Sequence, residues 1–229
     1  MLREPASLAA ESYRSACHRL LLAAEPVSPR VIAILSAMPL EGKTTTAVNY
    51  AIALAQHGIK VLLVDADLRQ PSLHDFFGLE LQPGLRDVLN DDDGKGADLP
   101  WEIAQQPGLW VLTAGDCHNG GARVLDAKSI APLIERWREN YDYVVIDTPP
   151  ATLISDALVL SACADESVLV VRSGMTTRRA IRRTCDALQR AHANVSGILL
   201  NAVETTHYYG YGARGARNAE AYYGQSHRI

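Results

Sequence analysis

Short apolar runs alternate with longer amphipathic stretches along most of the chain. The short runs are aliphatic and β-branched, which predicts buried strands, and the stretches between them have helical spacing. This alternation predicts an α/β fold in which one parallel sheet is covered by helices on both faces. The expected strands are residues 31–35, 61–64, 109–112, 143–146, 168–171 and 198–200, and the clearest helices are 43–57, 130–139, 156–162 and 178–192.

The same pattern divides the chain into three segments. Residues 1–30 predict an N-terminal helix and a connector, because Pro26 and Pro29 end any helix before the first strand. Residues 31–203 hold every expected strand and form a single core domain. Residues 204–229 have no periodic apolar face and predict a flexible, tyrosine-rich tail.

The first expected strand runs into a loop that ends at Gly42, Lys43 and Thr44. A loop at a helix N-terminus presents unpaired N–H groups and the positive end of the helix dipole to an anion. Lys43 adds a charge for the β- and γ-phosphates of a nucleotide, and the Thr44 hydroxyl is a ligand for Mg²⁺. We therefore predict a Walker A loop, the core of a P-loop domain. Its expected nucleotide contacts are Pro39, Leu40, Glu41, Gly42, Lys43, Thr44 and Thr45.

The loop departs from the pattern G-x-x-x-x-G-K-[ST] at the first position, which is Ala37. In addition, Leu40 stands where a second glycine is frequent. A leucine is strained wherever the backbone requires a positive φ. The alternative interpretation of this motif alone is a chance Gly-Lys-Thr in a strand-to-helix turn.

Three aspartates follow the expected strands. Asp147 comes after residues 143–146 and has the Walker B form, which holds Mg²⁺ directly or through water. Asp65 and Asp67 alternate, so both can face the same side, one supporting the metal and the other accepting a proton. Because the carboxyl ends of parallel strands meet at one edge, we expect all three near Lys43. The alternative is that these aspartates cap the following helices.

Longer motifs point to a family. The stretches VLLVDADLRQPSLHDFFGL (61–79), PGLRDVL (83–89), YDYVVIDTPP (141–150) and SDALVL (155–160) resemble the catalytic domain of the bacterial tyrosine kinases, or BY-kinases, of capsule and exopolysaccharide synthesis. That family is similar in fold to the MinD/ParA ATPases. The resemblance implies an ATP-dependent protein tyrosine kinase with ATP and Mg²⁺ as cofactors.

The family's residue roles extend to matching positions of this chain. The resemblance implies that Lys43 and Thr44 bind nucleotide and metal, and that Asp67 and Asp147 surround Mg²⁺. It also implies that Asp65 is the base for the attacking tyrosine hydroxyl. Asn201 falls where the superfamily contacts the purine base, and its alternative role is a turn residue at a strand end.

The tail carries the family's second hallmark. It contains five of the nine tyrosines of the chain. In BY-kinases such a cluster is the autophosphorylation substrate and enters the active site of a neighbouring subunit. The alternative is an aromatic tail that packs onto its own domain or onto a partner. The implied phosphorylation sites are Tyr208, Tyr209, Tyr211, Tyr222 and Tyr223.

The N-terminal helix bears on assembly. BY-kinases carry E-x-x-R-x-x-R there, a pattern used in the subunit contacts of a ring. Glu11 and Arg14 match it, but Cys17 stands at the second arginine, whose bidentate fork a thiol does not replace. We expect a homo-oligomer, leave ring formation open, and retain a surface helix with incidental charges as the alternative.

Composition narrows the partners. A net charge of −4 and a pI near 6.0 disfavour general binding of nucleic acid. Four scattered cysteines without a C-x-x-C pair indicate reduced thiols and no zinc site. No apolar run is long enough to span a bilayer. The resemblance implies a cytoplasmic protein that lies at the inner face of the plasma membrane. Its implied partners are a transmembrane, polysaccharide co-polymerase-type activator, which binds it through a cytoplasmic tail, and a cognate tyrosine phosphatase.

Two other functions remain open. One is a MinD/ParA-like ATPase, although its signature lysine would fall at Met38 and is absent. The other is a nucleotide-binding scaffold without kinase activity. A GTPase is disfavoured because the chain lacks an N-K-x-D motif. One helix near the C-terminal end of the core has a basic face that comprises Arg178, Arg179, Arg182 and Arg183. This face is either solvated or a contact, and the contact would be an acidic segment of a partner or a membrane surface.

Overall fold

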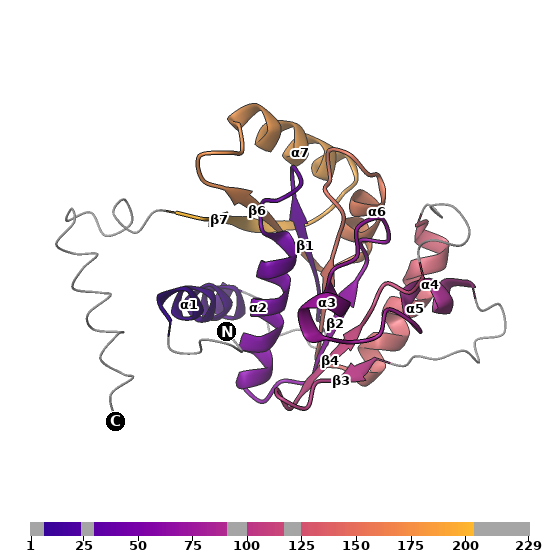
Figure 1. The fold of residues 1–229 in the computed structure, drawn as a ribbon. Helices are drawn as coiled ribbons and strands as arrows, with labels where there is room; N and C mark the ends of the chain where they lie inside the picture. The colour runs from indigo at the N-terminus through magenta and orange to yellow at the C-terminus, as the bar shows by residue number, and fades with distance from the viewer. Residues whose placement is uncertain (1–6, 24–29, 91–99, 117–124, 204–229) are drawn as a thin grey trace, which may run out of the picture.

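Seven strands form one sheet in the order β3-β4-β2-β5-β1-β6-β7 (Figure 1). Neighbouring strands are parallel except for β3 and β4. The structure is a computed structural model that describes residues 7–23, 30–90, 100–116 and 125–203, so the predicted tyrosine tail lies outside the described residues. The strands are β1 Arg30–Ser36, β2 Val61–Asp65, β3 Trp101–Glu102, β4 Leu109–Leu112, β5 Tyr143–Asp147, β6 Glu166–Arg172 and β7 Val195–Asn201.

Helices cover both faces of this sheet. One face packs on α1 and α2, which share a core with Ile32, Leu63 and Val145. The opposite face packs on α5, α6 and α7, through cores that contain Leu62 and Leu169. The helices are α1 Leu8–Ala23, α2 Lys43–Gln56, α3 Leu73–Phe77, α4 Leu85–Asn90, α5 Ala127–Asn140, α6 Asp156–Cys163 and α7 Arg178–Arg190.

The predicted fold class is confirmed, since each of the six expected strands and four expected helices is present. Three short elements were not predicted, namely α3, α4 and the two-residue strand β3, which pairs antiparallel with β4. None of the helices in the described ranges combines the length and the apolar character that crossing a bilayer requires.

Helix α2 is buried nearly all round. Its residues from Thr46 to Ala55 are buried without exception, because the sheet covers one side and α1 the other. Cys17 is the fully buried contact of α1 in this core, and burial raises the pKa of its thiol to about 12. The position where the family pattern has an arginine therefore faces inward here, and the thiol is unreactive.

An ion pair joins α5 to the end of the sheet at which β1 and β6 begin. Asp165 accepts two hydrogen bonds from the Arg138 guanidinium, at 2.7 and 2.8 Å, and one from the Val31 N–H at 2.7 Å. Partial burial raises the pKa of Asp165, but these hydrogen bonds outweigh it and the net pKa is lowered. The carboxylate thus stabilises the fold in its charged form.

We expect Asp165→Asn to lower the free energy of unfolding by about 1–2 kcal/mol near neutral pH, because it removes the charge that Arg138 and Val31 bind. A lowered pKa means that this contribution is present above the ordinary aspartate value, about 3.9, and is lost as pH falls below it. Urea unfolding of both proteins at about pH 7 and about pH 3 should therefore show the difference shrinking in acid.

Glu135→Gln is the matched control. Glu135 also contacts Arg138, at 3.3 Å, but its side chain is 73% exposed. This variant should change the free energy of unfolding by less than about 0.5 kcal/mol. Equal losses in the two variants would contradict the role given to Asp165.

Candidate nucleotide site

The phosphate loop joins the end of β1 to the start of α2. Gly42 precedes the helix with φ 89°, in the left-handed region that glycine adopts easily. Leu40 also has a positive φ, 63°, and its side chain is 80% exposed. The strain expected for a leucine in this loop is therefore present, and no packing of the side chain compensates for it.

A buried carboxylate holds the loop in shape. Glu41 is 1% exposed and accepts a hydrogen bond of 2.8 Å from the Met38 N–H. Its second oxygen accepts the hydroxyl of Thr176, which lies just before α7. The side chain of Glu41, predicted only as a nucleotide contact, is thus an internal brace of the loop.

The end of the sheet supports the same loop. Arg172 donates to the Leu40 carbonyl at 3.0 Å, and Asn201 Nδ2 donates to the Glu41 carbonyl at 3.0 Å. A Cβ at position 42 would lie 2.0 Å from Asn201 Nδ2, so this approach requires Gly42. Asn201 uses its amide on the loop here, and its contact with a purine base stays a prediction.

Lys43, Thr44 and Asp147 form a bonded cluster at the start of α2. Lys43 Nζ lies 2.7 Å from Asp147 Oδ1, and Thr44 Oγ1 donates to Asp147 Oδ2 at 2.6 Å. Lys43 is 7% exposed and Asp147 is fully buried. The strand-end aspartate and the phosphate loop therefore meet as the sequence predicts.

The two aspartates after β2 differ in their surroundings. Asp67 Oδ2 lies 3.8 Å from Lys43 Nζ. Asp65 instead accepts N–H bonds from Asp67 on Oδ1, at 3.2 Å, and from Ser72 and Leu73 on Oδ2, both at 3.0 Å. The sequence places both aspartates beside the loop correctly, but only Asp67 directly approaches the lysine.

Burial changes the proton affinity of the buried carboxylates. The pKa of Asp65 is raised to about 7, first by burial and then by the charge of Asp147, its neighbour across the β2–β5 pair, while the N–H bonds of Leu73 and Ser72 oppose the rise. Burial also raises the pKa of Asp147, and Lys43 opposes that rise. Burial therefore favours the protonated form of both carboxyl groups more than water does.

The donor set fits a polyphosphate with Mg²⁺. Thr44, Asp67 and Asp147 offer only hard oxygen ligands. Within the described ranges, no three His, Cys, Asp or Glu side chains converge on a metal site. Mg²⁺ suits such a place, because it is commonly held by one or two carboxylates together with phosphate oxygens. Thr45 lies on the first turn of α2 and is exposed.

Other predicted residues lie apart from this cluster. Glu11 and Arg14 form an ion pair of 2.8 Å on α1, which packs on α2. The five predicted phosphorylation sites lie outside the described residues. Sequence reasoning missed Arg172 and Thr176, because their contacts in the loop are 132 and 135 residues away and no local signal marks them.

Comparisons with known proteins agree with this geometry. The family model of the CobQ/CobB/MinD/ParA nucleotide binding domain matches residues 32–221. Tyrosine-protein kinase YwqD of Bacillus subtilis is 35% identical over 217 residues, which cover 95% of this chain and 91% of YwqD. Putative tyrosine-protein kinase EpsB of Ralstonia nicotianae is 34% identical over 97% of this chain, but over only 29% of EpsB.

Solved structures give the same result. The kinase domain of Escherichia coli tyrosine kinase ETK has a TM-score of 0.82 and 30% identity, over 91% of this chain and 81% of that chain. MinD of Pyrococcus horikoshii, complexed with Mg-ADP, has a TM-score of 0.64 and 27% identity, over 84% of this chain and 76% of that chain.

A phosphate loop after the first strand of a parallel sheet, with aspartates ending the neighbouring strands, defines a P-loop nucleotide-binding protein. Together with the comparisons, this shows that the chain belongs to the CobQ/CobB/MinD/ParA family and, within it, to the bacterial tyrosine kinases.

We expect Leu40→Gly to raise the free energy of unfolding by up to about 1 kcal/mol, because glycine relieves the positive φ and little side-chain burial is lost. Leu153→Gly is the control, since Leu153 is 63% exposed and has no positive φ. It should be destabilised by about 0.5–1 kcal/mol. Thermal or urea unfolding measures both, and a Leu40→Gly protein as destabilised as the control would refute the strain.

Proposed function

We propose that this chain is an ATP-dependent protein tyrosine autokinase that phosphorylates the tyrosine cluster of its own tail, between subunits. The carrying observation is the bonded cluster of Lys43, Thr44 and Asp147 beside two further aspartates. This cluster occurs in a chain related over 95% of its length to Tyrosine-protein kinase YwqD.

The residues of the cluster have separate roles in this reaction. Bound Mg²⁺-ATP supplies the phosphoryl group. Lys43 neutralises charge on the transferring phosphate, and the N–H groups at the start of α2 orient it. Thr44, Asp67 and Asp147 would hold Mg²⁺ through their side-chain oxygen atoms. The buried Lys43–Asp147 pair balances charge before the nucleotide binds.

Asp65 is the proposed base. A tyrosine hydroxyl has an ordinary pKa of about 10, so a carboxylate that takes its proton favours the attack at neutral pH. A carboxylate has about four acceptor sites. The three N–H bonds to Asp65 leave one acceptor site unused on a side chain that is fully buried, and its raised pKa makes it a better proton acceptor than an ordinary aspartate.

The tail is a suitable substrate because it is joined to the core. A tethered tyrosine has a high local concentration at a neighbouring active site, with no dedicated pocket. Five tyrosines accumulate charge of about −1.5 to −2 each when phosphorylated, and their repulsion would loosen an oligomer. Glu11 and Arg14, which are both partly exposed on α1, are the proposed subunit contacts.

The family context supplies the proposed setting. The match covers 91% of YwqD but only 29% of EpsB, and both relatives are named as tyrosine-protein kinases. We propose that this chain acts at the cytoplasmic face of the plasma membrane with a transmembrane, co-polymerase-type activator, through the activator's cytoplasmic tail. A cognate tyrosine phosphatase would reverse the reaction, and the cycle would regulate capsule or exopolysaccharide synthesis or export.

Intact-mass spectrometry tests the kinase. Incubation with ATP and Mg²⁺ should add up to five phosphates, and replacing all five tail tyrosines by phenylalanine should remove them. Lys43→Ala should slow the reaction on the order of 10²–10³-fold, because it removes the cation that faces the transferring group. Chelation of Mg²⁺ should stop the reaction altogether.

Lys128→Ala is the matched control, since Lys128 is exposed on α5 and its loss should leave the rate unchanged. Circular dichroism would verify that Lys43→Ala remains folded despite the unpaired Asp147. ATP hydrolysis without any phosphate on the protein, even after the activator's cytoplasmic tail is added, would replace the kinase by an ATPase. Nucleotide binding without either reaction would indicate a scaffold.

A further inference from the structure

A cavity of about 370 Å³ lies between the phosphate loop and α7. Its walls include Met38 from the loop, Ala151 and Thr152 after β5, and Ala180 and two arginines of α7. None of the residues of the catalytic cluster lines it. Its volume falls within the range of small-ligand sites, so we call it the α7 groove.

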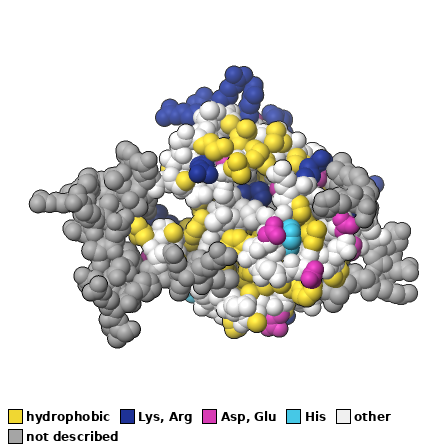
Figure 2. All heavy atoms as spheres, in the orientation of Figure 1, with side chains coloured by type: hydrophobic (Ala, Val, Ile, Leu, Met, Phe, Trp, Pro, Cys, Tyr) yellow, Lys and Arg dark blue, Asp and Glu magenta, His cyan; other side chains and the backbone are white. Residues whose placement is uncertain are grey.

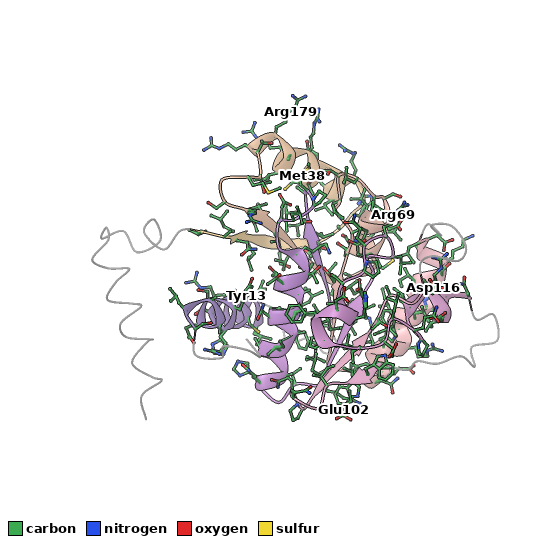
Figure 3. The ribbon with its side chains drawn as sticks, in the orientation of Figure 1. Tyr13, Met38, Arg69, Glu102, Asp116 and Arg179 are labelled. Carbon is green, nitrogen blue, oxygen red and sulfur yellow. The ribbon has the colours of Figure 1, made fainter. Side chains whose placement is uncertain are left out.

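Four arginines stand on the first two turns of α7, and all are exposed. Within the described part of the chain, none of their side chains takes part in a hydrogen bond or ion pair. Arg179 and Arg183, one turn apart, line the groove, whereas Arg178 and Arg182 do not. In Figure 3 Met38 lies beneath α7, and Arg179 extends from that helix. The groove therefore has a basic rim whose charge is unmatched.

Apolar surface adjoins this rim. Met38 and Ala151 form part of the wall. Leu153 and Met175 are 63% and 47% exposed nearby in the chain. Figure 2 shows basic side chains along the top of the molecule with a hydrophobic patch directly below them. An apolar wall under two arginines suits a ligand that joins an aromatic ring to a phosphate, because arginine binds phosphate through two parallel hydrogen bonds.

The tail of this chain supplies such a ligand. It continues from Val203, directly after β7, whose last residue already contacts the phosphate loop. Tyr208 is five residues beyond Val203, which an extended chain spans in about 17 Å. The unmodified tail holds three arginines and two glutamates, so it has no net negative charge to offer. Each phosphate adds about −1.5 to −2 and creates the complementarity.

We propose that the α7 groove is a phosphotyrosine-binding site that takes the phosphorylated tail, residues 204–229. This inference rests on the proposed autokinase for the origin of the phosphates. Docking then depends on phosphorylation, and it keeps a modified tail at the edge of the phosphate loop, where it no longer competes as substrate.

Isothermal titration of the full, unphosphorylated chain tests the site with synthetic peptides of residues 218–229. The form carrying phosphate on Tyr222 and Tyr223 should bind at least about tenfold more tightly than the unmodified form. Peptides with phosphoserine or glutamate at the same two positions should bind at least about tenfold more weakly than the phosphotyrosine form, because they lack the ring or the phosphate.

Two double variants separate the groove from general charge. R179Q/R183Q should weaken phosphotyrosine binding by about tenfold or more. R178Q/R182Q removes the same charge from the same helix outside the groove and should change it by less than about threefold. The proposal would be overturned if both double variants lost the same affinity for the phosphotyrosine peptide, or if the glutamate peptide bound as tightly as that peptide. Either result would indicate a general contact for an acidic segment of a partner.

Anionic vesicles provide the competing occupant. If vesicles bind through all four arginines and the phosphopeptide fails to displace them, the face is a membrane contact and the proposal fails. The peptides carry their phosphates already, so binding is independent of kinase activity. If the chain binds the phosphopeptides but never phosphorylates itself, the groove proposal stands and the autokinase proposal fails. If it phosphorylates itself but does not bind them, the autokinase proposal stands and the groove proposal fails.

Discussion

The buried pair of Lys43 and Asp147 is the interaction on which the rest of the site depends. Two charges 2.7 Å apart in a dry place are stable only together, because each alone would carry a large desolvation penalty. The Thr44 hydroxyl uses the second oxygen of Asp147 and completes the pairing. The cluster is balanced without a nucleotide, so a bound polyphosphate exchanges one set of partners for another.

Strand register delivers these groups to one point. Asp147 ends β5, which lies between β1 and β2, and pairs with Ile34 on one side and Asp65 on the other. The loop after β1 and the aspartates after β2 must therefore converge. This convergence follows from topology and needs no long side-chain network, which explains why short sequence motifs at strand ends predict it well.

The sequence predicts the sheet and the main helices because their apolar patterns are continuous. It misses α3, whose five residues are positioned by the side chain of Asp65 accepting the N–H groups of Ser72 and Leu73. It also misses β3, whose pairing with β4 is tertiary. The strain at Leu40 could be anticipated, because the motif itself calls for a positive φ there.

The contacts that brace the loop could not be predicted in the same way. Asn201 and Thr176 have no motif that links them to Glu41, and their partners are 160 and 135 residues away. Only the fold brings the ends of β6 and β7 beside the loop. A resemblance of residue 201 to a base-contacting position therefore does not reveal that its amide also supports Glu41.

These braces give the α7 groove a physical link to the nucleotide site. Thr176 lies two residues before α7, and its hydroxyl donates to Glu41; Met38 donates its N–H to the same carboxylate and lines the groove. A ligand held by Arg179 and Arg183 thus contacts the first turns of a helix that is tied to the phosphate loop. Such a ligand changes nucleotide affinity only if it binds the protein with a different affinity when the hydrogen bonds of Glu41 hold the loop than when they are broken. A ligand shifts an equilibrium only by that difference in affinity. In the structure Glu41 is buried and both of its oxygens accept hydrogen bonds, so the observed groove is the groove of the braced loop.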